Sequence, residues 1–177
     1  QPRSVFHRVP EGVEPRIAAM ALPIGNGFQW AYLDGGAGPG QTVVVQGPGQ
    51  QGLACVIAAK AAGASTVICT GLARDDHRLE AAKRLGADHV VMVDKESLPN
   101  AIARITKNQG VDLAIDVSSG GASEVIGGAI QTLKKRGKLL VAAYKRTKLD
   151  DCELDAIIAK QIALLCLRGH SYKSLEL

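Results

Sequence analysis

Aromatic residues are scarce in this chain of 177 residues, which has two Phe, three Tyr and one Trp. Single-stranded nucleic acid is commonly bound on stacked aromatic side chains, and this sequence offers few of them. A strong excess of one charge is also missing, because 21 Lys and Arg stand against 17 Asp and Glu, a net charge of +4. That small excess is spread along the chain, so we expect no nucleic-acid partner.

Long apolar runs and paired cysteines are missing as well. No run approaches the roughly 18 apolar residues of a membrane span, so no membrane partner is expected. Residues 1–10 contain no apolar stretch, so no signal peptide is expected either. The four cysteines, Cys55, Cys69, Cys152 and Cys166, lie far apart and form no CxxC pair. This spacing argues against a zinc cluster or a disulfide framework and favours a reducing, cytoplasmic compartment.

The sequence does contain a regular alternation of short apolar runs and helical patterns. The runs begin near Thr42, Thr66, His89, Val111, Lys138 and Ile162. Each run is continuous rather than alternating, so both faces of each strand should be covered. Between the runs, apolar residues recur at helical steps, as at Leu53, Ile57 and Ala61. We therefore predict an α/β fold with a doubly wound, parallel, six-stranded sheet, the Rossmann fold.

The first forty residues break this rhythm. They contain two predicted helices, Val13–Leu22 and Gly25–Leu33, followed by a glycine-rich turn. We predict that residues 1–40 are a helical lead-in that packs against the sheet, and that residues 41–177 form the sheet domain. Glycines are expected just after helices, at Gly63, Gly86, Gly110 and Gly137. The basic cluster 134–138 would then be the solvated C-terminal end of a helix.

A glycine pattern, GxGxxG, follows the first predicted strand and opens a helix. Gly47 permits a tight turn, Gly49 lets a pyrophosphate approach the backbone, and Gly52 lets the helix pack close to the strand. The helix N-terminus adds free N–H groups and the positive end of its dipole. We predict that this loop binds a dinucleotide cofactor through Gly47, Pro48, Gly49, Gln50, Gln51 and Gly52. The alternative is that the glycines only form a tight turn.

The second predicted strand lacks the carboxylate that usually binds the adenosine ribose at its end. Gly71 and Leu72 follow the strand, and Arg74 comes two residues later. Glycine leaves room and arginine supplies charge, which is the arrangement that accommodates a 2′-phosphate. We therefore predict that NADP is preferred over NAD. In the alternative, Arg74 is a solvated loop residue and Asp75 binds the ribose.

Five segments together resemble the medium-chain dehydrogenase/reductase superfamily, which includes zinc-type alcohol dehydrogenases and quinone reductases. They are residues 22–30, 40–53, 58–64, 78–88 and 111–116. The resemblance implies the cofactor-binding domain of an oxidoreductase that transfers hydride between a nicotinamide and a carbonyl, alcohol or enone. It also implies that most of a GroES-like catalytic domain is missing, so the chain alone is expected to be inactive.

The resemblance implies roles for further residues, each with an alternative. Arg78 matches a basic residue near the adenosine ribose, although it could be a residue of a helix surface. Val117 and Ser118 match the stretch that lines the passage between ribose and nicotinamide, although Ser118 could be a helix N-cap. Ala142 and Ala143 match backbone that binds the nicotinamide carboxamide. The last strand, 162–167, matches one that pairs across a two-fold axis in homodimers, although it could be a covered edge.

One position departs from the zinc-dependent members of the superfamily. Where they carry the third catalytic zinc ligand, commonly Cys, this chain has Asn26. A neutral amide oxygen binds zinc poorly compared with thiolate or imidazole. We therefore expect no zinc in this chain and assign it no metal-ligating or catalytic residue. The alternative for Asn26 is a capping or turn residue.

The leading hypothesis is thus the NAD(P)-binding domain of a medium-chain oxidoreductase, an enzyme in its full-length form. A second hypothesis of another class is a non-catalytic dinucleotide-binding module that acts as a sensor or scaffold. A third, a methyltransferase-type domain, is disfavoured because it too would need an acidic residue after the second strand. The substrate is left unassigned, because the residues that shape its pocket would lie mostly outside this chain.

Overall fold

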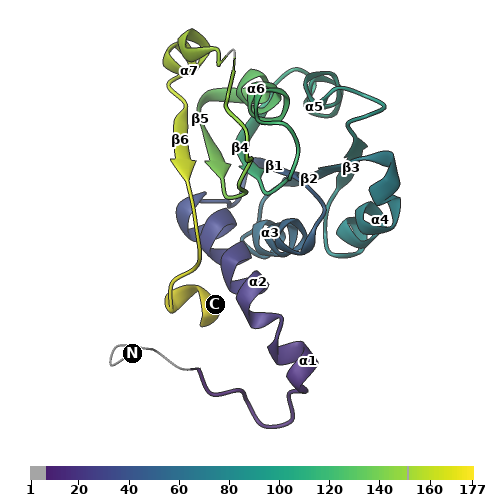
Figure 1. Ribbon diagram of the computed structural model, residues 1–177, viewed down its shortest axis with the longest axis vertical. Coiled ribbons are helices and arrows are strands. Elements are labelled where there is room, and N and C mark those ends of the chain that lie inside the picture. The colour runs from purple at the N-terminus through teal and green to yellow at the C-terminus, as the bar shows by residue number, and fades with distance from the viewer. Residues whose placement is uncertain (1–6, 151) are drawn as a thin grey trace.

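A computed structural model describes residues 7–150 and 152–177 and contains a six-stranded parallel sheet (Figure 1). The strands are β1 (Thr42–Gln46), β2 (Thr66–Gly71), β3 (His89–Met92), β4 (Val111–Asp116), β5 (Leu133–Val141) and β6 (Ala163–Cys166). Their order across the sheet is β3-β2-β1-β4-β5-β6, and every neighbouring pair is parallel. This is the doubly wound order of the Rossmann fold, so the predicted fold is confirmed.

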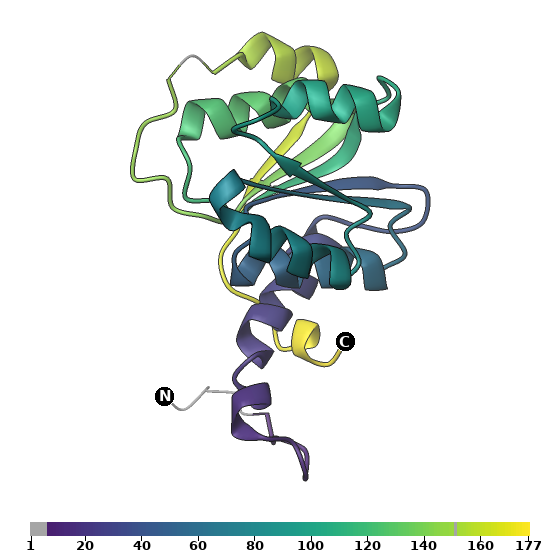
Figure 2. The same cartoon turned by 90° about the vertical axis from the view of Figure 1, so that its right-hand side faces the viewer.

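Helices cover both faces of the sheet, which gives three layers (Figure 2). The helices of the sheet domain are α3 (Gln50–Ala61), α4 (Asp76–Arg84), α5 (Leu98–Thr106), α6 (Ala122–Thr132) and α7 (Leu154–Lys160). Short 3-10 turns are η2 (Ala73–Asp75) and η3 (Lys173–Leu175). The helices α3 and α4 lie on one face, and α5, α6 and α7 lie on the other.

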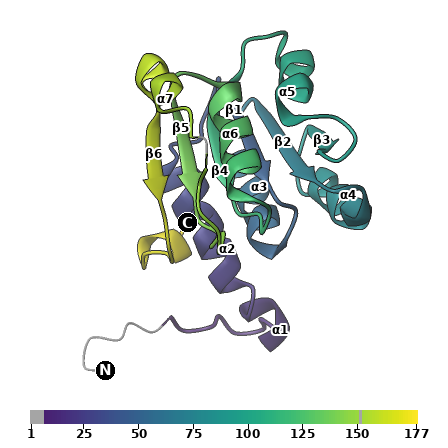
Figure 3. The same cartoon turned by 45° about the horizontal axis from the view of Figure 1, so that its top comes forward.

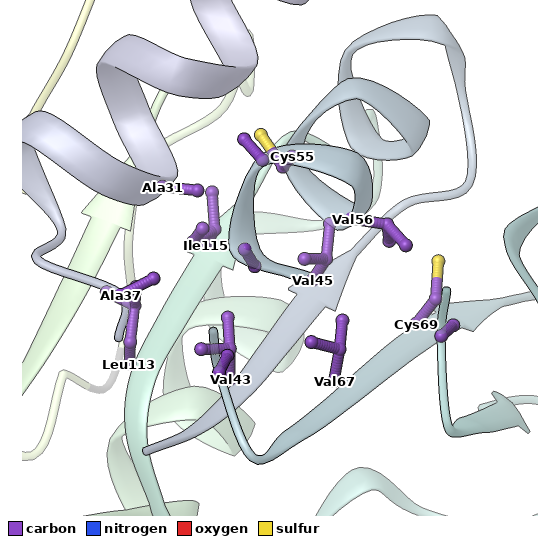
Figure 4. Close-up of a cluster of buried hydrophobic side chains, with 14 of the residues drawn as sticks. Ala31, Ala37, Val43, Val45, Cys55, Val56, Val67, Cys69, Leu113 and Ile115 are labelled. Atoms are coloured by element: carbon purple, nitrogen blue, oxygen red, sulfur yellow. The ribbon is translucent and has the colours of Figure 1, made fainter. Parts of the chain in front are cut away.

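The core consists of two apolar clusters, one on each face of the sheet. Along β1, Val43 and Val45 point to the α3 side, and Val44 points to the side of α5 and α6. Figure 4 shows Val45 beneath α3 on the side of its Cys55, and Val43 further along the same strand. Because both faces are buried, the strands read as continuous apolar runs. The small residues of α3 allow this helix to lie close to the sheet.

The lead-in differs from its predicted form. It consists of α1 (Pro15–Ala18), α2 (Ala21–Gly27) and the π-helix η1 (Phe28–Asp34). The predicted break between Leu22 and Gly25 was wrong, because α2 runs through it. Pro23 lies in the first turn of α2, where a proline costs no intrahelical hydrogen bond. The lead-in joins the core through the buried Trp30, whose indole N–H donates to the carbonyl of Gly169 at 2.9 Å.

The start of β5 also corrects a prediction. The basic cluster 134–138 and Gly137 lie inside β5, not at the end of a helix. Helix α6 ends at Thr132, and its C-cap Leu133 already has extended backbone. The pairing with β4 then shifts register between Val111 and Leu113, which forms a bulge. Gly63 and Gly86 do come just after helices, with positive φ, whereas Gly110 lies four residues past the end of α5, whose left-handed C-cap is Lys107.

Of the four cysteines, two are buried and two are exposed. Cys55 and Cys69 lie in the core, and Cys152 and Cys166 are exposed. Burial raises the pKa of both buried thiols to about 12. Within residues 7–150 and 152–177, no helix has the length and apolar character required to cross a bilayer.

We expect Cys55 and Cys69 to be inert towards a thiol reagent at pH 8 while the chain is folded. The thiolate is the reactive form, and a thiol with a pKa of about 12 remains protonated at that pH. Titration with dithionitrobenzoate should therefore count the two exposed thiols, Cys152 and Cys166, in the folded chain and all four after denaturation. Rapid reaction of more than two thiols in the folded chain would contradict the buried placement.

Candidate dinucleotide-binding site

A groove of about 740 Å³ lies at the carboxyl end of the sheet. Its walls come from the ends of β1 and β2, the loops after β3 and β4, and the first turns of α5 and α6. From β1 the chain turns towards β2 and β3, and β4 then returns to the other side of β1. Ligands of open α/β sheets bind at such a switch point. The lining includes Gly47, Pro48, Gly49, Gly71, Leu72, Arg74, Arg78, Val117 and Ser118, all predicted from the sequence.

The glycine loop between β1 and α3 has the shape that its sequence predicts. Gly47 has φ of +106°, and a Cβ there would lie 2.9 Å from the Cα of Ser118. A Cβ at Gly52 would collide with the carbonyl oxygen of Gly47. By contrast, no described atom lies within 4 Å of a Cβ built at Gly49, which is the N-cap of α3. The helix N-terminus is thus open to an anion, which fits a pyrophosphate.

The missing carboxylate after β2 has a packing cause. A Cβ at Gly71 would lie 2.8 Å from Cγ of Pro48 and 3.3 Å from Cδ2 of Leu79. The space next to Gly71 is therefore filled by the proline of the glycine loop. The sequence predicts that this space leaves room for a 2′-phosphate. In the structure Pro48 fills it, so the role of Gly71 is close packing against the glycine loop.

Two carboxylates fix the turn that follows β2. Asp75 accepts a hydrogen bond from the N–H of Leu72 at 3.1 Å, and Asp94 accepts one from the N–H of Ala73 at 2.9 Å. Arg78 donates to the second oxygen of Asp75 at 3.3 Å. Arg74 lines the same groove and forms none of the ion pairs found among residues 7–150 and 152–177.

The opposite wall is fixed by a buried carboxylate at the end of β4. Asp116 is fully buried and accepts hydrogen bonds from the N–H and the Oγ–H of Ser118, at 3.0 and 2.8 Å. Lys145, in the loop after β5, forms an ion pair with the other oxygen of Asp116 at 2.6 Å. Because the N-cap of α6 is Gly121, the alternative that Ser118 caps this helix was wrong.

Sequence reasoning missed Asp116, Lys145 and the wall formed by the loop after β3, residues 93–99. A local signal existed only for Asp116. It directly follows the apolar residues 113–115, and a carboxylate on a buried strand needs a partner. Nothing in the local pattern identifies Lys145 as that partner, because the two residues lie on different loops.

Five predicted residues are not in the lining: Gln50, Gln51, Gly52, Ala142 and Ala143. The side chain of Gln51 points towards α2, where its oxygen accepts a hydrogen bond from Asn26 at 3.2 Å. Of Gln51, the backbone N–H in the first turn of α3 is thus the group left for a ligand. Ala142 continues the ladder of β5, and its N–H donates to the carbonyl of Asp116 at 3.0 Å.

The surroundings of Asn26 do not fit the role of a zinc ligand. It is buried within α2, and Nδ1 of His170 lies 2.8 Å from its amide oxygen. Its amide nitrogen donates to Gln51, so both ends of the amide are engaged by protein atoms. It also forms no cap hydrogen bond, so the capping alternative was wrong. No group of three or more His, Cys, Asp or Glu in the described part of the chain could hold a metal ion.

Comparison with known proteins adds independent findings. Residues 52–175 match the family model described as zinc-binding dehydrogenase. The chain is 32% identical over 166 residues to D-arabitol-phosphate dehydrogenase of Enterococcus avium, a match that covers 94% of this chain and 46% of the relative. It is 35% identical over 147 residues to a probable alcohol dehydrogenase of Mycobacterium tuberculosis, covering 81% and 39%. The chain therefore spans less than half the length of these curated relatives.

Two solved structures of dehydrogenases are also similar to this chain, and it covers less than half of each. Benzyl alcohol dehydrogenase from Acinetobacter calcoaceticus superposes with a TM-score of 0.81 at 25% identity, covering 91% of this chain and 44% of that one. An alcohol dehydrogenase zinc-binding domain protein from Burkholderia ambifaria has a TM-score of 0.79 at 26% identity, covering 90% and 42%.

The surroundings of Gly47 and Gly127 predict opposite changes in stability when each is replaced by alanine. Gly47→Ala should destabilise the chain by about 2 kcal/mol, because φ is positive and the new Cβ would press on Ser118. Gly127→Ala, inside α6 and with no described atom within 4 Å of its Cβ, should stabilise it by about 0.5 kcal/mol. Urea denaturation measures both. A Gly47→Ala variant as stable as the wild type would show that the loop is not strained there.

Proposed function

The chain belongs to the medium-chain, zinc-type alcohol dehydrogenase family, and we propose that it is the NAD(P)-binding domain of a larger oxidoreductase. One observation carries this proposal. The glycine loop leaves Gly49 and the N-terminus of α3 open towards a groove of about 740 Å³ at the switch point of the sheet. We take residues 41–177 as this domain and residues 1–40 as a lead-in from the catalytic domain.

Three parts of the groove would hold three parts of the dinucleotide. The loop 47–52 and the N-terminus of α3 bind the pyrophosphate. The turn 71–78 binds the adenosine half, since it follows β2 on one side of the loop. Residues 117–118 line the groove on the other side, after β4, and bind the nicotinamide riboside half; residues 142–143 follow β5 next to that wall, outside the lining, and contact the carboxamide through their backbone. The bound nicotinamide supplies the hydride chemistry with a carbonyl, alcohol or enone.

The hydrogen bonds that the Ser118 hydroxyl already forms determine how it can contact a ligand. Its hydroxyl hydrogen is donated to Asp116 at 2.8 Å, and its oxygen accepts a hydrogen bond from Lys145 at 3.1 Å. A hydroxyl has one donor and two acceptor sites. Ser118 therefore offers the groove an acceptor and no donor, which suits a ribose hydroxyl as the donor.

We propose a preference for NADP over NAD on the basis of the arginines. The carboxylate of Asp75 already accepts the N–H of Leu72 and pairs with Arg78. The guanidinium of Arg74 lines the groove outside the ion pairs found among the described residues. A guanidinium matches the geometry of a phosphate, so Arg74 can contact a 2′-phosphate without losing a partner.

The parent enzyme would carry its catalytic lobe outside this chain, in a GroES-like domain. The role of the residues described here is to bind and orient the cofactor, and no step is assigned to zinc. The isolated chain should therefore bind the dinucleotide without turnover. The four free thiols support a cytoplasmic location for the parent.

Calorimetric titration of the chain should show binding of NADPH and NADH, with NADPH the tighter ligand. Arg74→Gln should weaken NADPH binding by about tenfold and change NADH binding by less than about twofold. Arg84→Gln, on the exposed last turn of α4 and outside the groove, is the matched control.

Each outcome of this titration has a distinct meaning. Binding of neither dinucleotide would remove the proposed function. Tighter binding of NADH would overturn only the NADP preference, and saturable turnover of an alcohol by the chain alone would overturn its predicted inactivity.

We also propose that the edge strand β6 mediates a homodimer. Figure 3 shows β6 and β3 at the two edges of the sheet. Leu164 and Leu165 of β6 are 45% and 38% exposed, and β6 pairs only with β5 among the described strands. An open edge with apolar side chains favours pairing with a second chain.

Light scattering after size exclusion should report a dimer at micromolar concentration. Leu164→Lys should shift the mass to that of the monomer, because it places a charge on the pairing edge. Leu85→Lys, which changes a leucine of 39% exposure at the end of α4, should leave the mass unchanged. A wild-type chain that is monomeric at all concentrations would contradict the proposal.

A further inference from the structure

We propose that Lys145 is a positioning residue that fixes the nicotinamide half of the groove. The inference rests on the proposed function, in which residues 117–118 and 142–143 hold that half. It concerns a buried ion pair, Lys145 with Asp116, that no sequence pattern indicated. The pair connects the loop after β5 to the loop after β4.

The ammonium group of Lys145 is almost completely removed from water. Its side chain is 9% exposed and that of Asp116 is 0% exposed. The ammonium lies 2.6 Å from Oδ2 of Asp116 and donates to the carbonyl of Ser118 at 2.8 Å and to its Oγ at 3.1 Å. Two of its three N–H donors are thus used by Ser118, and its contact with Asp116 is an ion pair by distance, since Oδ2 has no hydrogen-bond partner in the described part of the chain. A buried charge is retained only when it is paired in this way.

These contacts determine where Ser118 lies. Its N–H and hydroxyl are bound by Asp116, and its carbonyl is bound by Lys145. Its Cα lies next to Gly47, since a Cβ on that glycine would be 2.9 Å away. Lys145 thus fixes one loop against the glycine loop and connects it to the segment that contains Ala142 and Ala143. The two predicted contact segments for the nicotinamide riboside are held by one side chain.

The adenosine half of the groove has supports of its own. The turn after β2 is held by Asp75 and Asp94, which accept the N–H groups of Leu72 and Ala73. Among the described residues, none of these four forms a hydrogen bond or an ion pair with Lys145. Loss of Lys145 should therefore loosen one half of the groove and leave the other half in place. This asymmetry separates positioning from a general contribution to folding.

The test compares whole dinucleotides with probes of the adenosine half. Calorimetry of the full chain measures affinity for NADPH and NADH, and for 2′,5′-ADP and ADP. Lys145→Met should weaken both dinucleotides by about tenfold and both adenosine probes by less than about twofold. Lys145→Arg, which keeps the charge and the donors, should retain most of the affinity. Lys148→Met, in the same loop but exposed, should match the wild type.

A double variant covers the case in which Lys145→Met folds poorly. In Asp116→Asn/Lys145→Met no buried charge is left unpaired, so thermal stability should recover while the dinucleotide affinity remains about tenfold low. Recovery of full affinity would overturn the proposal, because Lys145 would then only neutralise Asp116. Equal losses for dinucleotides and adenosine probes would overturn it too, as would wild-type affinity in Lys145→Met. If the wild type binds none of the four ligands, the proposed function itself fails.

Discussion

The close packing of α3 against the end of β1 is the constraint on which the rest of the structure depends. A Cβ at Gly52 would collide with the carbonyl of Gly47, so the helix begins as near to the strand as a backbone permits. The same helix is approached from the other side by α2, where a Cβ at Gly27 would collide with the backbone of Ala54. Because α3 is fixed on two sides, its N-terminus opens at a defined point of the groove. The lead-in is therefore part of the architecture that positions the N-terminus of α3.

From this fixed point the groove extends in two directions, and each wall is held by different chemistry. On the side of β2, Asp75 and Asp94 accept backbone N–H groups at the rim. On the side of β4, Asp116 is fully buried and its charge is balanced by Lys145. In both walls carboxylates fix the backbone through hydrogen bonds. Only in the second wall, at Asp116 and Lys145, are the charged groups buried away from water. The end of β4 is thus joined to the loop after β5 by a buried ion pair.

Sequence patterns were sufficient for those parts of this fold that depend on local order. The spacing of apolar runs predicted all six strands, and the glycine pattern predicted a turn that lines the groove. The patterns failed where distant residues decide. Gly137 reads as a helix end, but the bulge opposite Val111 and Leu113 places it inside β5. Pro48 occupies the space next to Gly71, and Lys145 pairs with Asp116 across two loops. Contacts of this kind leave no periodic trace in the sequence.

The difference in exposure between the two walls determines which charges can respond to a ligand. Arg78 is 52% exposed, and an exposed ion pair contributes little to stability, so its guanidinium can leave Asp75 for a phosphate at small cost. Lys145 cannot do the same, since leaving Asp116 would strand a fully buried carboxylate. In the proposed function, the arginines after β2 are the groups that discriminate between dinucleotides that differ in a phosphate. The buried pair is suited to hold geometry, which is what orientation of a nicotinamide ring for hydride transfer requires.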